Sequence, residues 1–177
     1  MARDFAKLLT RVWKDEDWLS LSAIEQTVYI SLLTTDDLSW CGVAPLLPQR
    51  LAGFASDLSV AKARKALDVL TEKRFVVADE DAGEVAVRSF VRNDKVVSQP
   101  NITRAMLKAF DLVRSERIAS VITQELARSY AEEPDLKGWA TVKSVTPDLF
   151  DIISKGSPKG SAKGSPDPSP MGSGKAS

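Results

Sequence analysis

Hydrophobic residues recur at helical spacing early in the chain, with polar residues between them. The first apolar stripe consists of Ile24, Val28, Tyr29, Leu32 and Leu33. Positions three and four apart share one face of an α-helix, so the stripe predicts a helix with one buried side. Ser22 and Glu25 have the spacing of a capping box, which places this helix at about 22–34.

A second apolar stripe consists of Val60, Ala63, Leu67 and Leu70. Ser59 precedes it and is a typical N-cap, so we predict that another helix begins there. Between the two stripes, Pro45 favours an extended piece around 40–45. Pro48 suits the first turn of a short helix, which makes the helix after Ser59 the third.

Two β-rich runs follow the third predicted helix. They cover residues 75–79 and 84–92, and the sequence EDAG separates them. Strands joined by a short turn that contains glycine are typical of a β-hairpin. If the second run is one strand, Arg88 and Arg92 lie on the same face of it, because side chains alternate along a strand.

Helical spacing returns after the hairpin. One apolar face consists of Ile102, Ala105, Met106, Ala109, Phe110 and Val113, and another of Ile118, Val121, Ile122 and Leu126. We expect Asn101 to cap the first of these helices and Ser115 the second, which ends near Tyr130. These faces either cover the preceding core, which we favour, or supply the interface of a homodimer.

The end of the chain has a different composition. Pro134 and Gly138 predict a loosely ordered segment, and from Lys155 the chain is mostly Gly, Ser, Pro and Lys, which predicts disorder. We therefore expect one domain over 1–95, whose order of elements is that of a winged helix-turn-helix, and a helical extension packed on it over 96–133, followed by the loose segment over 134–154 and a disordered tail over 155–177.

The order of these elements predicts the fold class. Helix, short strand, short helix, tight turn, helix and hairpin follow one another as in a winged helix-turn-helix. The expected fold is therefore mainly α with a small β-hairpin, a winged helix-turn-helix followed by a two-helix C-terminal extension. In this arrangement the third helix buries one stripe, and its opposite face is left to enter the major groove of DNA.

Charge is balanced overall but unevenly distributed. The 177 residues contain 24 Lys and Arg against 24 Asp and Glu. Residues 14–37 hold one cation and six acids, whereas residues 59–74 hold five cations and two acids. Residues 86–128 form a second basic region, with eight cations and four acids. The neutral total therefore conceals acidic and basic faces.

Several chemistries lack their usual residues. The chain has no His and a single cysteine, Cys41, which argues against histidine-based catalysis, most zinc sites and an internal disulfide. No Gly-rich phosphate loop and no apolar run of membrane-spanning length is present in the sequence. We expect a cytoplasmic protein that is not an enzyme, with no catalytic or metal-ligating residues, no cofactor, no small-molecule substrate and no membrane partner.

The candidate DNA-binding residues lie mainly on the third predicted helix. They are Ser59, Lys62, Arg64 and Lys65 on that helix, Gln49 and Arg50 on the second, and Arg88 and Arg92 after the hairpin. Cations neutralise phosphates or contact guanine edges, and serine reaches either. The alternative is that these charges form an ordinary solvated surface.

The hairpin tip carries charge of the wrong sign for DNA. Its acids are Asp79, Glu80, Asp81 and Glu84. Phosphates would repel them, so we expect the third helix to read the groove while the tip points away or stays idle. The alternatives are that the tip meets a basic protein or that its acids only keep a turn soluble.

Three stretches carry a family resemblance: WLSLSAIEQTVYISLL, GVAPLLPQRLAGFASDLSVAKARKALDVL and EVAVRSFVRNDKVVSQPNI. In them the chain resembles the N-terminal winged-helix domains of phage replisome organisers, and especially the helix-turn-helix DNA-binding proteins of actinobacterial phages. The similarity covers about residues 8–130. This resemblance implies that the protein binds double-stranded DNA and that a helical extension packs on the winged domain. It also implies a role in the initiation or organisation of phage replication.

Two other functions fit the same residues. A transcriptional regulator, such as a repressor, would use the same surface, and partners would then include transcription rather than replication proteins. A winged-helix protein-interaction module would keep the fold without touching DNA. Palindromic DNA sites require a dimer, so the expected oligomeric state depends on the target.

Overall fold

The N-terminal helices begin where local capping signals occur. The computed structural model describes residues 6–156 of the chain. A 3₁₀ helix η1 (Thr10–Lys14) and a short α1 (Glu16–Leu19) precede α2 (Ala23–Thr34). The capping box of α2 is confirmed, because the Ser22 N–H donates to Glu25 Oε2 at 2.6 Å and the Glu25 N–H donates to Ser22 Oγ at 3.4 Å.

Helix α3 (Pro48–Ala52) begins with proline as expected, and α4 (Val60–Glu72) follows the predicted Ser59 cap. The Lys62 N–H donates to Ser59 Oγ at 3.3 Å. The buried face of α4 consists of Ala63, Ala66, Leu67 and Leu70. Val60 is 37% exposed instead of buried, because the first residue of the helix lies beside the solvated cap.

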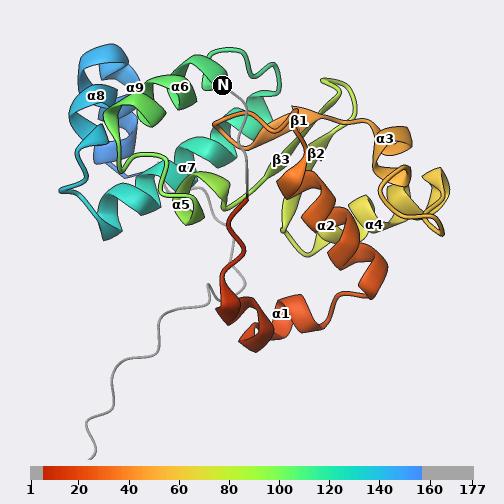
Figure 1. Ribbon diagram of the computed structural model, residues 1–177. Coiled ribbons are helices and arrows are strands. Elements are labelled where there is room, and N and C mark those ends of the chain that lie inside the picture. Colours follow the sequence, from red (N-terminus) through yellow and green to blue (C-terminus); the bar gives the residue numbers. More distant parts are fainter. Residues whose placement is uncertain (1–5, 157–177) are drawn as a thin grey trace, which may run out of the picture.

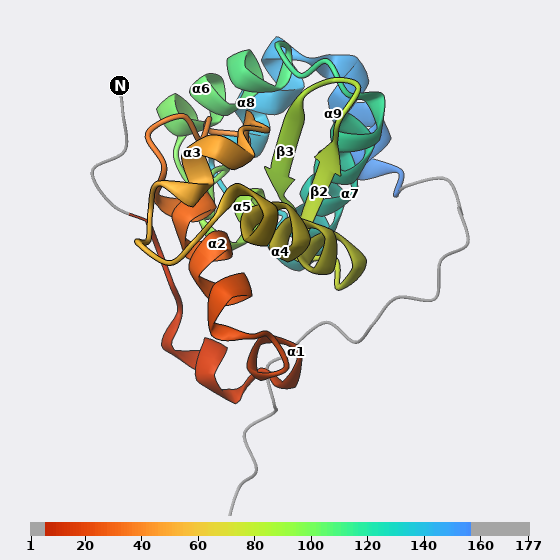
Figure 2. The same cartoon turned by 90° about the vertical axis from the view of Figure 1, so that its right-hand side faces the viewer.

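A three-stranded antiparallel sheet joins the two halves of the molecule. Strand β3 (Glu84–Val87) lies between β1 (Val43–Pro45) and β2 (Val76–Asp79). Helices α2 and α4 lie on one side of this sheet, and α7 (Glu116–Glu132) passes on the other (Figures 1 and 2). All four residues of β3 are therefore buried. The fold is mainly helical with a small sheet.

The second β-run ends earlier than the sequence suggested. Strand β3 stops at Val87, and the next residues form the short helix α5 (Phe90–Asn93). The Val87 N–H donates to the carbonyl of Gly42, just outside β1, and β2 pairs only as far as Val87. One further bond follows, from the Arg88 N–H to the Phe75 carbonyl at 3.2 Å, and the chain then turns into α5. Arg88 and Arg92 therefore do not share a strand face.

After α5, the described part of the chain contains four helices instead of the two expected. After α6 (Pro100–Phe110) and α7 come α8 (Gly138–Val145) and α9 (Pro147–Ser154). Ser115 caps α7 as predicted, with its Oγ accepting from the Ile118 N–H at 3.1 Å. Asn101 does not cap α6, since Pro100 already occupies the first helical position; its Oδ1 accepts from Arg104 Nη1.

The loose segment expected over 134–154 is mostly helical, and Gly138 shows why. A Cβ atom at Gly138 would lie 2.2 Å from both Thr103 Oγ1 and the Val97 carbonyl oxygen. Glycine therefore permits close packing here rather than flexibility. Trp139, Val142 and Ile153 are buried, and the rings of Tyr130, Trp139 and Phe150 meet edge to face. The predicted disordered tail lies outside the described residues apart from Lys155 and Gly156.

The apolar faces of α6 and α7 pack within the chain. Met106, Ile118, Ile122 and Leu126 are all buried in one continuous core with residues of the N-terminal half. These side chains therefore cover the core, which is the alternative that we favoured. Between residues 6 and 156, no helix combines the length and apolar character needed to cross a membrane.

Candidate nucleic-acid interface

Helix α4 turns its three N-terminal cations to solvent. Lys62, Arg64 and Lys65 are all exposed, and α4 lies at the front of the molecule in Figure 2. Lys62 Nζ donates to the carbonyl oxygen of Asp57 at 2.8 Å. The side chain of Lys65 makes no hydrogen bond or ion pair with any residue that the structure describes. The outer face of this half of α4 is therefore basic and accessible.

Charge changes sign along the exposed face of α4. Lys62, Arg64 and Lys65 occupy its N-terminal half, whereas Asp68 and Glu72 are exposed in its C-terminal half. An anionic ligand would be attracted to the first half and repelled by the second. The N-terminal half of α4 is thus the half that suits an anionic ligand.

Helix α3 adds two exposed polar residues beside this end. Gln49 and Arg50 follow Pro48 at the start of α3, and α3 packs against α4. Arg50 forms an ion pair with Asp37, in which the side chains are 50% and 35% exposed. Exposed pairs contribute only about 0–1 kcal/mol, so a phosphate can compete with Asp37 for Arg50.

Arg88 and Arg92 have a different environment. Their Nε atoms lie 3.4 Å and 3.2 Å from the carboxylate oxygens of Glu125 on α7, and the Glu125 side chain is 2% exposed. Arg128 Nη1 approaches the same carboxylate at 3.2 Å. Arg92 also lies 3.7 Å from Glu132. Both arginines neutralise a buried carboxylate, which attaches the segment after β3, including α5, to α7.

Two acids at the hairpin tip bind the start of α7. Glu84 is 7% exposed, and its carboxylate accepts the backbone N–H groups of Arg114 and Ser115 at 3.1 Å and 3.0 Å. The hydroxyl of Ser115 donates to Asp79 Oδ2 at 2.6 Å. Carboxylates are favoured at a helix N-terminus because they accept unpaired N–H groups and face the positive end of the dipole.

The hydrogen bonds to Asp79 favour its ionised form. The hydrogen bond from Ser115 is the main cause that lowers the pKa of Asp79 below its usual value of 3.8, and the Ala82 N–H lowers it further. Both donors favour the ionised carboxylate. The tip is therefore neither idle nor only a soluble turn, because Asp79 and Glu84 fasten the C-terminal helices to the hairpin.

The sequence contained only a weak signal for this arrangement. Asp79 and Glu84 stand out as acids near a turn, but their partners lie 36 and 31 residues away in Ser115. The sequence predicted Ser115 as the N-cap of α7, but it gave no sign that the Ser115 hydroxyl also donates to Asp79. Likewise Glu125 occupies the same helical face as Ile118 and Ile122, and a charge on an apolar face suggests a buried partner.

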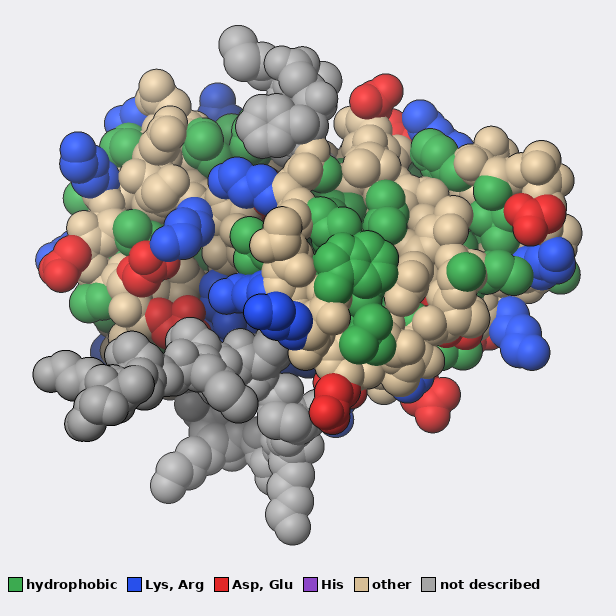
Figure 3. Space-filling view, turned by 60° about the horizontal axis from the view of Figure 1, so that its bottom comes forward, with side chains coloured by type: hydrophobic (Ala, Val, Ile, Leu, Met, Phe, Trp, Pro, Cys, Tyr) green, Lys and Arg blue, Asp and Glu red, His purple; other side chains and the backbone are tan. Residues whose placement is uncertain are grey.

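Other surfaces offer less defined chemistry. A hollow of about 590 Å³ lies between the start of α6 and the loop before α8, lined by Ser98, Gln99, Pro100, Asn101, Asp135, Leu136 and Lys137. Figure 3 shows hydrophobic side chains gathered on the face where η1 and α1 lie, and the exposed apolar residues of this segment are Leu8, Leu9, Trp13 and Leu19. Within the described part of the chain, no His, Cys, Asp or Glu side chains cluster in a way that would hold a metal ion.

Comparison with known proteins adds no relative. No family model, no curated protein and no solved structure matches the chain.

Proposed function

We propose that the protein binds double-stranded DNA through the N-terminal half of α4. The observation that carries this proposal is the division of α4 into a buried apolar stripe and an exposed basic end with Lys62, Arg64 and Lys65. A helix that packs by one face offers the other to a partner. A major groove admits one α-helix, and its phosphate rims attract cations.

The surrounding elements support a winged helix-turn-helix. Helices α2, α3 and α4 are followed by the β2–β3 hairpin, and β1 pairs with β3. In this proposal α4 is the recognition helix, with Ser59, Lys62, Arg64 and Lys65 at its groove end. Gln49 and Arg50 contact the DNA backbone. We leave Arg88 and Arg92 out of the contact surface, because both are paired with buried Glu125.

The biological role that we propose is phage replication initiation or organisation, without catalysis. It rests on the sequence resemblance to replisome-organiser domains. A transcriptional regulator with the same surface is the second candidate, and binding to promoter DNA rather than to origin-like repeats would favour it. A protein-interaction module is the third, and it predicts no salt-dependent duplex binding.

The proposal is tested by selecting bound duplexes from a random pool and titrating the selected duplex at several salt concentrations. Lys62→Ala with Lys65→Ala should weaken binding about tenfold or more and lower the slope of log K against log salt by roughly 1.8, since each lost phosphate contact removes about 0.9. Lys108→Ala with Lys143→Ala is the matched control, because both lysines are exposed on the C-terminal helices. Equal binding by both double variants would contradict the proposal.

A further inference from the structure

We infer that Arg114 and Arg117, at the start of α7, form a second phosphate-binding point beside the hairpin tip. The inference rests on the proposed DNA binding by α4 and extends the contact surface to the C-terminal helices. It also explains how an acidic hairpin can lie next to a DNA-binding helix.

The path of the chain brings the hairpin tip back to the basic end of α4. After α4, Arg74 adopts a left-handed conformation (φ 62°), and the Phe75 N–H donates to the Leu70 carbonyl at 2.8 Å. Strand β2 then returns past the helix toward its N-terminal half. Arg64 of α4 lies 3.6 Å from Glu80 of the tip, which places the two segments side by side. A ligand held by this end of α4 therefore lies near the tip.

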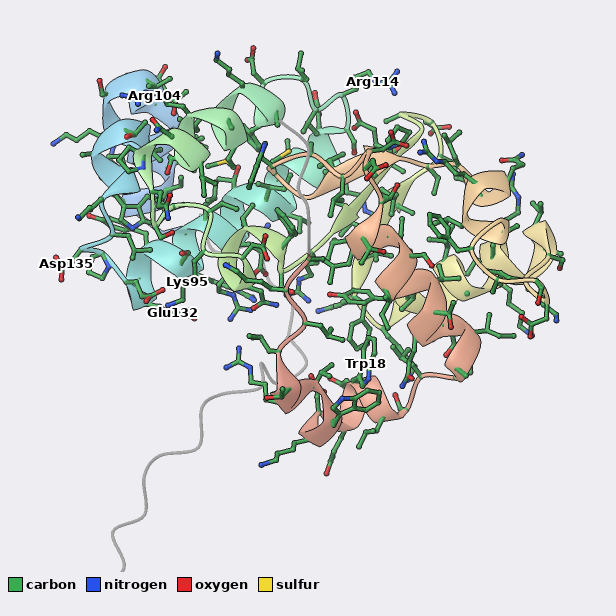
Figure 4. The ribbon with its side chains drawn as sticks, viewed as in Figure 1. Trp18, Lys95, Arg104, Arg114, Glu132 and Asp135 are labelled. Carbon is green, nitrogen blue, oxygen red and sulfur yellow. The ribbon has the colours of Figure 1, made fainter. Side chains whose placement is uncertain are left out.

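Arg114 is attached to the tip but remains largely exposed. Its Nε lies 3.5 Å from Glu84 Oε1, and its side chain is 71% exposed. Figure 4 shows Arg114 projecting outward beside the loop between β2 and β3. A guanidinium has five N–H donors in a planar fork, so one contact with Glu84 leaves others for a phosphate. The backbone N–H of Arg114 donates to Glu84, which fixes the position from which the Arg114 side chain extends.

Arg117 adds a second cation on the first turn of α7. It is exposed, and its charge acts favourably on Asp79. The two arginines are three residues apart, so one lies just before α7 and the other inside its first turn. Together they place two positive charges on the side of the tip where the helix begins.

The local charge at the tip is much less negative than the hairpin sequence suggests. Arg64 pairs with Glu80, Arg114 pairs with Glu84, and the charge of Arg117 acts on Asp79. Adding these three cations to the four acids Asp79, Glu80, Asp81 and Glu84 gives a formal charge of −1 in place of −4. Glu84 is also buried beneath backbone N–H groups. Repulsion of phosphates therefore comes mainly from Glu80 and Asp81, which are exposed on the loop itself.

The cations of the second basic region, residues 86–128, thus differ in how exposed they are. Arg88 and Arg92 are 27% and 20% exposed and serve Glu125, whereas Arg114 is 71% exposed. Exposed cations can neutralise phosphates and so release the counterions that are condensed on DNA, which favours binding. The helices after the hairpin therefore contribute to DNA binding through the start of α7 rather than through the residues that follow β3.

The test compares Arg114→Gln with Arg117→Gln, as one double variant, with the wild-type chain on the selected duplex across a salt series. We expect the salt slope to fall by roughly 1.8 and the affinity at low salt to fall about tenfold, with the preferred DNA sequence unchanged. Arg104→Gln with Lys108→Gln is the matched control, because both are exposed cations on α6, and Arg104 lies away from the hairpin in Figure 4. It should leave the slope unchanged.

Two further variants separate the possible failures. Arg114→Lys with Arg117→Lys keeps both charges and should restore most of the slope, whereas a loss caused by altered docking of α7 would persist in it. If the glutamine variant binds like wild type while Lys62→Ala with Lys65→Ala does not, the inference is overturned and the proposed function stands. If the wild-type chain selects no duplex and shows no salt-dependent binding, the proposed function fails, and the inference fails with it.

Discussion

Glu125 provides the sharpest test of how α7 is held, because one buried carboxylate serves three arginines. We predict that Glu125→Gln lowers the free energy of unfolding by about 3 kcal/mol, since breaking a buried ion pair costs about 3–5 kcal/mol. The lower end applies because Arg88 and Arg92 keep 27% and 20% of their side-chain exposure, so water reaches them partly. Arg128, 44% exposed, adds little.

The measurement is equilibrium unfolding in urea, with thermal unfolding as a second probe. A loss of about 3 kcal/mol corresponds to a fall in Tm of roughly 6–12 °C in a chain of this size. Glu132→Gln is the matched control on the same helix. Glu132 also pairs with Arg92, at 3.7 Å, but its side chain is 51% exposed, so its loss should cost less than about 0.5 kcal/mol.

The comparison of these two variants can refute the argument. The argument fails if the free energies of unfolding of Glu125→Gln and Glu132→Gln differ by less than about 0.5 kcal/mol. In that case the ion pairs of Glu125 do not hold α7 in place, despite their short distances. Arg88 and Arg92 would then be available for other contacts, and their exclusion from the DNA-binding surface would lose its reason.

Two further predictions concern packing and capping in the C-terminal half. Gly138→Ala should destabilise the fold by about 1–3 kcal/mol in urea unfolding, because its Cβ would overlap Thr103; Gly53→Ala, with its nearest contact at 3.3 Å, should cost much less. Ser115→Ala should cost about 1 kcal/mol at neutral pH by removing a helix cap. Below pH 4, the Tm of Ser115→Ala should fall less steeply with decreasing pH than that of the wild-type chain. An equally steep fall in both proteins would contradict the bond between Ser115 and Asp79.

The sign of the pH effect follows from the direction of the Asp79 shift. The folded-state pKa of Asp79 lies below its usual value of 3.8, mainly because of the Ser115 hydroxyl. The corresponding stability is present above the unfolded pKa and is lost as the pH falls through the lower folded value. Without the hydroxyl the two values move closer together, so less stability remains to be lost in acid.

Sequence reasoning was accurate where the signal was local. The caps at Ser22, Ser59 and Ser115 each involve a bond to a residue three positions along the chain. Their helices were therefore placed to within a residue at the start. It failed at Gly138, where the deciding atoms belong to Val97 and Thr103 on another segment. It also failed after Val87, where the chain leaves the sheet and turns into α5.

The candidate site divides in the same way. Lys62 and Lys65 were placed on an exposed helix face by periodicity, because the buried stripe of an amphipathic helix determines which side remains outside. The roles of Arg88 and Arg92 depended on Glu125, which is more than 30 residues away in the sequence. No local sequence pattern predicts an ion pair between residues so far apart. Nor does composition reveal which acids are already paired.

The amino-acid sequence by itself determined the starts of α2, α4 and α7, their buried stripes and the acidic and basic segments of this protein, because hydrogen bonds and side-chain periodicity act over a few residues. Only the tertiary structure decided which charges meet. Glu84 and Asp79 hold the start of α7, and Glu125 takes up Arg88 and Arg92, because the sheet brings α7 against the hairpin. Contacts across 30 residues or more exist only after that packing has formed.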